Sequence, residues 1–296
     1  MPQATVHLIS LQPTTNASNF ISELNLVSFD SPPYLIKGRP CGWVQRPRTL
    51  NKDNLTAHEW DIFLVTKSPT LPAGMVLSLA DRVSATIEMP QAQYTALLSV
   101  AGQDAQAAGD TPPLPDNWQP DEVQAGRRGS KFYGLIPETE VLGALDREER
   151  PGELRLDHPM AWFLSTAEPA GIRGAPVLLF NLFKYRGGDR STHDEYMQGF
   201  KEKFGKAAGA QVRFMGEVGD LNFAVQGAGE GGRGWDEANL TQYDSVWHYA
   251  YMLSTDVYKE LNKEKILPKS RVFWSVSTRA FPTLVLAPAP TDIDGL

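Results

Sequence analysis

The chain has 296 residues, of which 42% are hydrophobic, so it is long enough for two ordinary cores of about 100 to 150 residues each. Its formal net charge of −7, with no cluster of Lys and Arg, predicts that nucleic acid is not a partner. No segment approaches the roughly 18 continuous apolar residues of a membrane span, so we expect no membrane partner. The N-terminal residues lack a secretory signal pattern, and the single Cys41 cannot form an internal disulfide. We therefore expect a cytoplasmic protein.

Residues 1–107 predict a first small domain of mixed strands and helices. Apolar and β-branched runs favour strands, and polar stretches with apolar residues at helical spacing favour helices. The strands are expected at 5–11, 34–44 and 59–66, and the helices near 17–24 and 91–101. The fourth strand of this domain is left open between residues 131–136 and 161–165.

Residues 108–174 begin with a Pro- and Gly-rich passage that includes Thr-Pro-Pro-Leu-Pro at 111–115. Such a composition is typical of a linker or a covering loop. We therefore predict a linker and covering segment here, with the last strand of the first domain left open within it.

Residues 175–282 predict a second domain, and residues 283–296 an extended tail. The expected elements are a strand at 177–185, a helix from 191 to 208, strands at 211–218 and 235–243, a helical region at 245–265 and a strand at 271–279. The order β-α-β-β-α-β is that of the ferredoxin-like arrangement.

The two halves also repeat each other. Thr-Val-His-Leu-Ile-Ser-Leu at 5–11 matches Pro-Val-Leu-Leu-Phe-Asn-Leu at 176–182, and each run is followed at a similar spacing by a Trp-Asp pair, at 60–61 and 235–236. A repeat of this length is a whole small domain, because solenoid units are about 20 to 50 residues long. The fold class is therefore predicted as α+β, with two tandem ferredoxin-like domains that form an intramolecular pseudo-dimeric α/β barrel around a shared chamber.

Side chains alternate between the two faces of a strand, so each strand of the second domain has an apolar and a mixed face. The apolar face, which includes Leu178, Phe180 and Leu182, is expected to lie under the helices. The mixed face is expected to line the chamber, opposite the first-domain residues Val6, Leu8, Ile62 and Leu64.

Four stretches of the second domain carry a resemblance to a known family. They are Pro-Val-Leu-Leu-Phe-Asn-Leu-Phe-Lys-Tyr-Arg (176–186), His-Asp-Glu-Tyr-Met (193–197), Arg-Phe-Met-Gly-Glu-Val (213–218) and Tyr-Asp-Ser (243–245). About residues 175 to 280 resemble an uncharacterised family of the dimeric α/β-barrel superfamily, whose relatives include the EthD-like proteins. The superfamily includes cofactor-independent monooxygenases, polyketide cyclases, lactone isomerases, decarboxylases and haem enzymes, so the resemblance implies a fold and leaves the chemistry open.

Acid–base chemistry needs a group whose pKa can be moved toward neutrality in a partly dry site. The candidate catalytic residues are His248, Arg213, Glu217 and Glu237. The candidate substrate-binding residues are Asn181, Phe183, Tyr185, Asn239, Tyr243, Phe273, His58 and Trp60. No two of the five histidines have the spacing His-x-x-x-His, and we expect neither a metal nor another cofactor. His193, in the first turn of a helix, is expected to cap the helix or to be solvated.

These residues predict a cofactor-independent enzyme that moves protons on a hydrophobic oxygenated small molecule, such as a polyketide- or terpenoid-like intermediate of secondary metabolism. Cyclisation, isomerisation and dehydration are the expected reactions. A cofactorless monooxygenase of phenolic or anthrone substrates and a non-catalytic binding protein remain alternatives. The sequence leaves open whether two chains pair as a homodimer.

Overall fold

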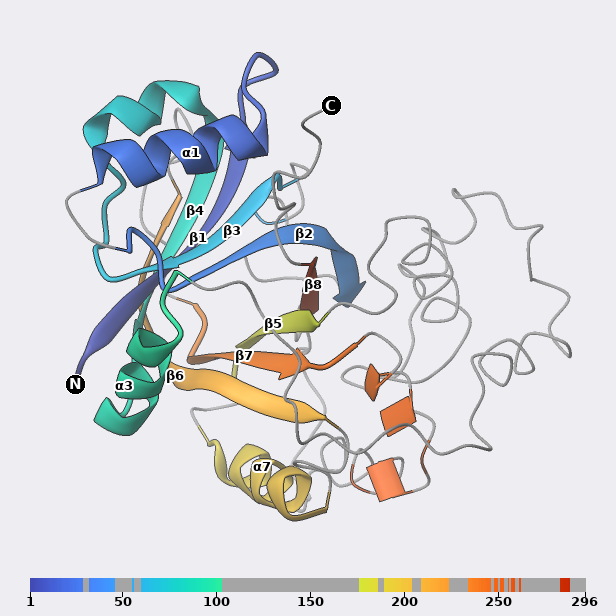
Figure 1. The fold of residues 1–296 in the computed structure, drawn as a ribbon. Coiled ribbons are helices and arrows are strands. Elements are labelled where there is room, and N and C mark those ends of the chain that lie inside the picture. The colour runs from blue at the N-terminus through green and yellow to red at the C-terminus, as the bar shows by residue number, and fades with distance from the viewer. Residues whose placement is uncertain are drawn as a thin grey trace, which may run out of the picture.

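The computed structural model describes residues 1–28, 32–45, 55, 60–102, 176–185, 189–203, 209–223, 234–245 and 283–287, and eight residues between 248 and 261. The elements of the first half are β1 (Gln3–Leu11), α1 (Ala17–Val27), β2 (Ile36–Gln45), β3 (Ile62–Thr66), η1 (Ala73–Ser78), β4 (Leu79–Glu88) and α3 (Gln91–Ser99). Those of the second half are β5 (Val177–Phe183), α7 (Ser191–Lys203), β6 (Ala210–Phe223), β7 (Glu237–Tyr243) and β8 (Thr283–Ala287). Figure 1 shows strands from both halves of the chain lying together, with α1, α3 and α7 on the outside. The predicted α+β class is confirmed.

The strands pair in the order β1-β3-β2-β8-β5-β7-β6-β4, and β4 returns to β1, so the described strands close into a barrel. Every pairing is antiparallel. The two halves meet along two seams, β2 with β8 and β4 with β6. At the second seam, Gln93 of α3 continues the pairing beyond the end of β4, because its Oε1 accepts a hydrogen bond from the backbone nitrogen of Met215 at 2.7 Å.

Two strands lie where the sequence analysis did not expect them. β4 at Leu79–Glu88 precedes α3 and pairs with β1, so the first half completes its four strands before residue 102. Asp81, Arg82 and Glu88 obscured the apolar alternation of this strand. β8 at Thr283–Ala287 lies in the predicted extended tail and pairs with both β2 and β5. The strand candidates at 131–136, 161–165 and 271–279 lie outside the described residues.

The interior of the barrel is filled by apolar side chains from both halves. Phe63 of β3 packs against Phe180 of β5, with ring centroids 5.3 Å apart. Val6 and Leu8 of β1 belong to the same buried cluster. The cluster also contains Leu178, Leu182, Phe214, Ala238 and Leu240. Eight strands enclose a space just wide enough for such side chains.

This packing inverts the predicted orientation of the second half. The apolar face of β5 and β7, expected under the helices, lies inside the barrel, and the mixed face, expected to line a chamber, lies outside beneath α7. Ile62 and Leu64, expected as partners across the chamber, lie in a separate cluster under α1 with Phe20 and Leu24. The alternation of a strand separates its two faces but does not say which of them points inward.

The two Trp-Asp pairs have the same structural role. The Asp61 carboxylate accepts a hydrogen bond from the backbone nitrogen of Leu11 at 2.7 Å, and the Asp236 carboxylate accepts one from that of Tyr185 at 2.5 Å. The Asp61 nitrogen donates to the Ile9 carbonyl and the Asp236 nitrogen to the Phe183 carbonyl, both at 2.8 Å. Each aspartate therefore ties the end of the first strand of its half to the start of the third.

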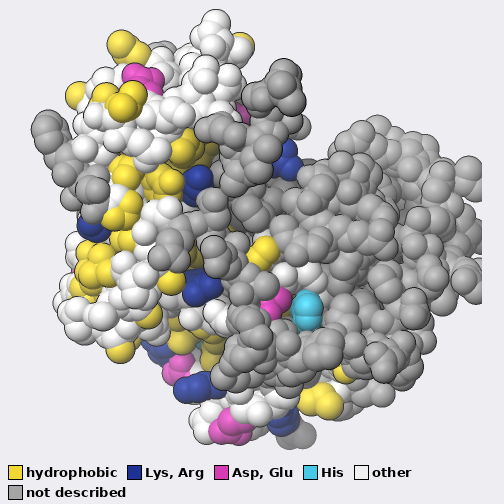
Figure 2. Space-filling model, in the orientation of Figure 1, with side chains coloured by type: hydrophobic (Ala, Val, Ile, Leu, Met, Phe, Trp, Pro, Cys, Tyr) yellow, Lys and Arg dark blue, Asp and Glu magenta, His cyan; other side chains and the backbone are white. Residues whose placement is uncertain are grey.

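On the face drawn in Figure 2, hydrophobic side chains gather over β1, β3 and β4, between α1 and α3. Lysine and arginine are scattered there among acidic side chains, so the described part of this face shows no concentrated basic patch. No helix among the described residues is long and apolar enough to cross a membrane.

We expect Asp61→Ala to lower the free energy of unfolding by about 1–2 kcal/mol, because it removes the acceptor of the Leu11 nitrogen. Urea denaturation followed by circular dichroism measures the change. Asp61→Asn keeps an acceptor oxygen and should lose less. Equal midpoints for Asp61→Ala and the wild type would contradict the role of this carboxylate.

Candidate functional site

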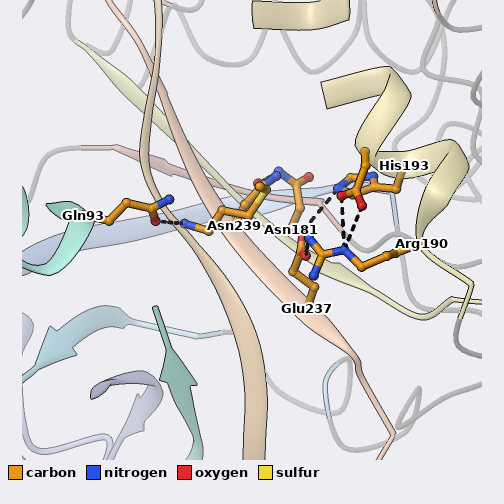
Figure 3. Close-up of polar contacts among 8 residues, drawn as sticks. Gln93, Asn181, Arg190, His193, Glu237 and Asn239 are labelled. Carbon is orange, nitrogen blue, oxygen red and sulfur yellow. Dashed lines mark hydrogen bonds and ion pairs between the residues drawn. The ribbon is translucent and has the colours of Figure 1, made fainter. Parts of the chain in front are cut away.

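The mixed face of the second half contains a buried carboxylate. Glu237 begins β7, and its side chain is only 2% exposed. One carboxylate oxygen lies 2.8 Å from Arg190 Nη2, and the other lies 3.2 Å from His193 Nε2 (Figure 3). A buried carboxylate stays ionised only with such partners.

Helix α7 and the residue before it supply the two partners. His193, Tyr196 and Phe200 follow one another at helical spacing, and all three are buried against the sheet. Arg190, just before the helix, is 41% exposed and also pairs with Asp194 at 3.1 Å. The carboxylates of Glu237 and Asp194 raise the pKa of Arg190 despite the opposing effect of its burial. Its charge therefore neutralises Glu237 from the solvent side.

Aromatic rings surround the His193–Glu237 pair. The centroid of His193 lies 4.4 Å from that of Phe183 and 5.4 Å from that of Tyr185. Burial, and then the charge of Glu237, raise the pKa of the Tyr185 hydroxyl, so it stays protonated near neutral pH. The pair is thus held in surroundings from which water is largely excluded.

Three buried polar atoms at this place lack a hydrogen-bond partner among the described residues. They are the Tyr185 hydroxyl, His193 Nε2 and Glu237 Oε1. His193 Nε2 and Glu237 Oε1 nevertheless lie 3.2 Å apart, within ion-pair distance, and Glu237 acts on the Tyr185 hydroxyl through its charge and a side-chain hydrogen bond, so the three groups interact mainly with one another.

A cavity of about 50 Å³ lies next to this pair, between α7 and the sheet. At its wall, the Asn181 Nδ2 donates a hydrogen bond to the Asn239 Oδ1 at 2.7 Å (Figure 3). Phe183 lines the cavity and also contacts His193, so it separates the two. The cavity is lined by Leu179, Asn181, Phe183, Tyr196, Met197, Phe200, Asn239, Thr241, Tyr243, Tyr249, Met252 and Tyr258.

The first half has no such polar cluster at the equivalent place. The strand registers and the hydrogen bonds of Asp61 and Asp236 show which positions of the two halves are equivalent. Ile62 is equivalent to Glu237, Leu64 to Asn239 and Ile9 to Phe183. In the first half these positions form the apolar cluster under α1. A buried charge in the second half, where the matched position of the first half carries Ile, makes this place a candidate functional site.

His7 is the polar exception in the first half, and its contacts are complete. Its Nδ1 lies 2.8 Å from the Ser84 hydroxyl, and its Nε2 lies 2.9 Å from the Thr66 hydroxyl. Burial, and then the charge of Arg82, lower the pKa of His7 to about 3. The residue is therefore a neutral, fully bonded part of the core.

The structure brings together Glu237 and five predicted substrate-binding residues on one face. Those five are Asn181, Phe183, Tyr185, Asn239 and Tyr243. The Tyr243 hydroxyl donates to Met252 Sδ at 3.3 Å, and burial raises its pKa.

The other predicted residues lie elsewhere or outside the described residues. Arg213 stands at an irregularity of β6 and donates to Gln242 Oε1 at 3.0 and 2.7 Å, on the opposite face of β7 from Glu237. Glu217 is exposed, and His248 Nδ1 lies 2.9 Å from the Ser245 hydroxyl. Trp60 is in the barrel core and donates to the Leu55 carbonyl at 2.8 Å. His58 and Phe273 are outside the described residues.

The sequence analysis missed His193 and Arg190. His193 is 7% exposed rather than solvated, and it faces Glu237. Its spacing of three residues from Tyr196 and seven from Phe200 was the available signal, because it places the three on one face of a helix. Among the described residues, no group of three or more His, Cys, Asp and Glu is placed to hold a metal ion.

No protein-family model and no curated protein matches the chain. Among solved structures, the crystal structure of a protein of unknown function from Rhodopseudomonas palustris is similar, with 18% identity over 43% of this chain and 93% of that chain. The TM-score is 0.27, which supports no inference about fold or function.

The pKa of His7 predicts a pH dependence of stability. Between about pH 6.5, its ordinary value, and about pH 3, the unfolded chain binds a proton at His7 that the folded chain does not. Its contribution to the free energy of unfolding therefore falls as the pH is lowered, by up to about 1.4 kcal/mol per pH unit. His7→Asn should show a flatter profile than the wild type in urea denaturation from pH 7 to 4. Parallel profiles would contradict this assignment.

Substituting apolar residues for the polar cluster of the second half tests whether that cluster is needed for folding. We expect the double substitution Glu237→Ile and His193→Ala to leave the melting temperature unchanged or raise it, because replacing a buried ion pair by apolar residues is often neutral or stabilising. Arg190 would remain paired with Asp194. The reverse change, Ile62→Glu, buries a carboxylate in the apolar cluster and should cost about 3–5 kcal/mol. A double variant that fails to fold would show that the cluster is structural.

Proposed function

We propose that the chain is an internal duplication of a ferredoxin-like unit, an intramolecular pseudo-dimeric α/β barrel of the dimeric α/β-barrel superfamily, related to EthD-like proteins. The strand order supports this: β4-β1-β3-β2 in one half corresponds to β8-β5-β7-β6 in the other. The matched hydrogen bonds of Asp61 and Asp236 also support it. In this proposal the second unit extends to Ala287, because β8 takes the place of its fourth strand.

We further propose that the protein is a cofactor-independent enzyme that transfers protons on a hydrophobic oxygenated small molecule. The observation that carries this proposal is the buried Glu237, which lies within 3.2 Å of His193 and 2.8 Å of Arg190 at the position where the first half has Ile62. Histidine is the side chain whose ordinary pKa lies nearest neutral, and a carboxylate beside it orients the ring and stabilises its charged form.

The roles follow from the contacts. Arg190 pairs with the Glu237 carboxylate, and Glu237 faces Nε2 of His193. When Nε2 carries the hydrogen, the lone pair of the neutral ring lies on Nδ1, which can accept a proton from a bound molecule. The protonated Tyr185 hydroxyl can donate a hydrogen bond to an oxygen of that molecule.

The acid–base centre proposed here differs from the catalytic residues predicted from the sequence. Glu237 keeps its predicted catalytic role, and His193 replaces His248 as the histidine. Arg213 and Glu217 leave the proposed centre, because one binds Gln242 on the opposite face and the other is exposed. Isomerisation, cyclisation and dehydration all begin with such a proton transfer and need no change of oxidation state.

Deuterium uptake tests the proposal without knowledge of the natural substrate. A panel of cyclic ketones and lactones is incubated with the protein in D₂O, and mass spectrometry follows deuterium incorporation at carbon. The wild type should accelerate incorporation into at least one member. Glu237→Gln and His193→Gln should each lower that rate about 10²–10⁴-fold.

The matched control is Glu202→Gln, which neutralises a carboxylate on an exposed part of the same helix and should keep the wild-type rate. The reaction should proceed equally under nitrogen, whereas an oxygenase would stop. Wild-type incorporation no faster than in buffer, or an unchanged rate in Glu237→Gln, would contradict the proposal.

A further inference from the structure

We infer that the cavity beneath α7 binds an uncharged carbonyl compound, and that Asn239 Nδ2 and Thr241 Oγ1 donate the hydrogen bonds that hold its oxygen. This inference rests on the proposed function, since it names the substrate class of the same site. It assigns two binding residues on β7, next to the acid–base pair.

Asn239 places an amide at the wall of the cavity. The residue is 3% exposed and forms part of the cavity wall. Its Oδ1 accepts from Asn181, which fixes the orientation of the amide and turns Nδ2 away from Asn181. Within the described part of the chain, Nδ2 donates to no acceptor. A buried amide that leaves a donor unpaired calls for an acceptor from a ligand or water.

Thr241 adds a second donor two residues along the same strand face. It is 7% exposed and lines the cavity. Its equivalent in the first half, Thr66, donates to the Ser68 carbonyl at 2.6 Å and lies 2.9 Å from His7. The Thr241 hydroxyl has no such partner among the described residues. The second half therefore keeps the hydroxyl and turns it toward a cavity.

The rest of the wall selects against charge. None of the described residues that line the cavity is ionised at neutral pH. Burial raises the pKa of Tyr196 to about 12 and raises those of Tyr243 and Tyr258 well above the ordinary value, so these hydroxyls remain neutral. A carboxylate or phosphate would lose its hydration without gaining a counter-charge. A ketone or lactone loses much less and gains the two donors.

The position of the donors suits the proposed chemistry. Glu237 and Asn239 are neighbours on one face of β7, about 7 Å apart along the strand. With the carbonyl oxygen at Asn239, the adjacent C–H bond can lie toward Phe183, whose ring stands between the cavity and the His193–Glu237 pair and must turn aside for the pair to reach that bond. That bond breaks, its proton passes to the pair, and its electrons form a C=C bond as the carbonyl becomes an enolate held by Asn239. Return of the proton to the opposite face of the same carbon, or to another carbon of an extended enolate, completes an isomerisation without an oxidant or reductant.

Binding of small probes to the full chain tests the inference. Ligand-observed NMR titrations compare cyclopentanone with cyclopentane, which has the same ring without oxygen, and with cyclopentanecarboxylate, which is charged. Cyclopentanone should bind most tightly. Thr241→Val and Asn239→Leu should each weaken its binding about 2- to 10-fold, the effect of one lost hydrogen bond. Neither should weaken the binding of cyclopentane.

The two substitutions are close matches for their sites. Valine has the shape of threonine, and leucine is the residue that the first half carries as Leu64. If Asn239→Leu does not fold, as judged by its thermal melt, Thr241→Val decides alone. The inference is overturned if cyclopentanone does not bind, if cyclopentane or the carboxylate binds as tightly, or if the folded variants keep the wild-type affinity for the ketone.

A third variant separates this inference from the proposed function. Glu237→Gln should keep the affinity for cyclopentanone and lose deuterium incorporation. If the wild type binds the ketone through Asn239 and Thr241 without incorporating deuterium, the binding inference stands and the proposed proton transfer fails. If incorporation occurs while the Asn239 and Thr241 variants bind and react normally, the proton transfer stands and the binding inference fails.

Discussion

The packing of one apolar sheet face against the other inside the barrel decides where a ligand can bind. Phe63 and Phe180 meet across the interior, and the side chains around them are buried and apolar. An eight-stranded barrel filled in this way has no room for a substrate among its described residues. The buried polar contacts of Glu237 with Arg190 and His193 lie instead on the outer face of the sheet, beneath α7.

The sequence predicted the α+β class and most of the described strands, because the alternation of apolar and polar residues is a local signal. It could not predict which face of β5 and β7 points inward, since a period of two is unchanged when a strand is turned over. β4 was missed because charged residues interrupt its pattern, and β8 because pairing with β2 and β5 is a long-range property. His193 was misjudged because its burial depends on Glu237, which is 44 positions away in the chain.

The contrast between the halves separates folding from function. The cluster under α1 shows that apolar residues suffice to hold a helix on this sheet. Under α7, Glu237, Asn239 and His193 interrupt the same contact with polar groups, among them the His193–Glu237 pair, whose facing atoms lie 3.2 Å apart. Leucine and isoleucine at these positions would stabilise the fold more than this polar cluster does. Its retention is explained if the second half binds and transforms a molecule while the first half serves as scaffold.

The tie formed by Asp236 shows how a structural repeat can position a site. Asp236 directly precedes Glu237, and its hydrogen bonds to Tyr185 and Phe183 fix the backbone where β5 ends and β7 begins. In the first half, the same hydrogen bonds of Asp61 position Leu11, Ile9 and Ile62. The side chains of these three residues pack in the apolar cluster under α1. The backbone geometry that the proposed site uses is thus one that the fold also has at Asp61. Changing a few side chains on one of two equivalent frameworks is then enough to place a carboxylate, a phenol and an imidazole together.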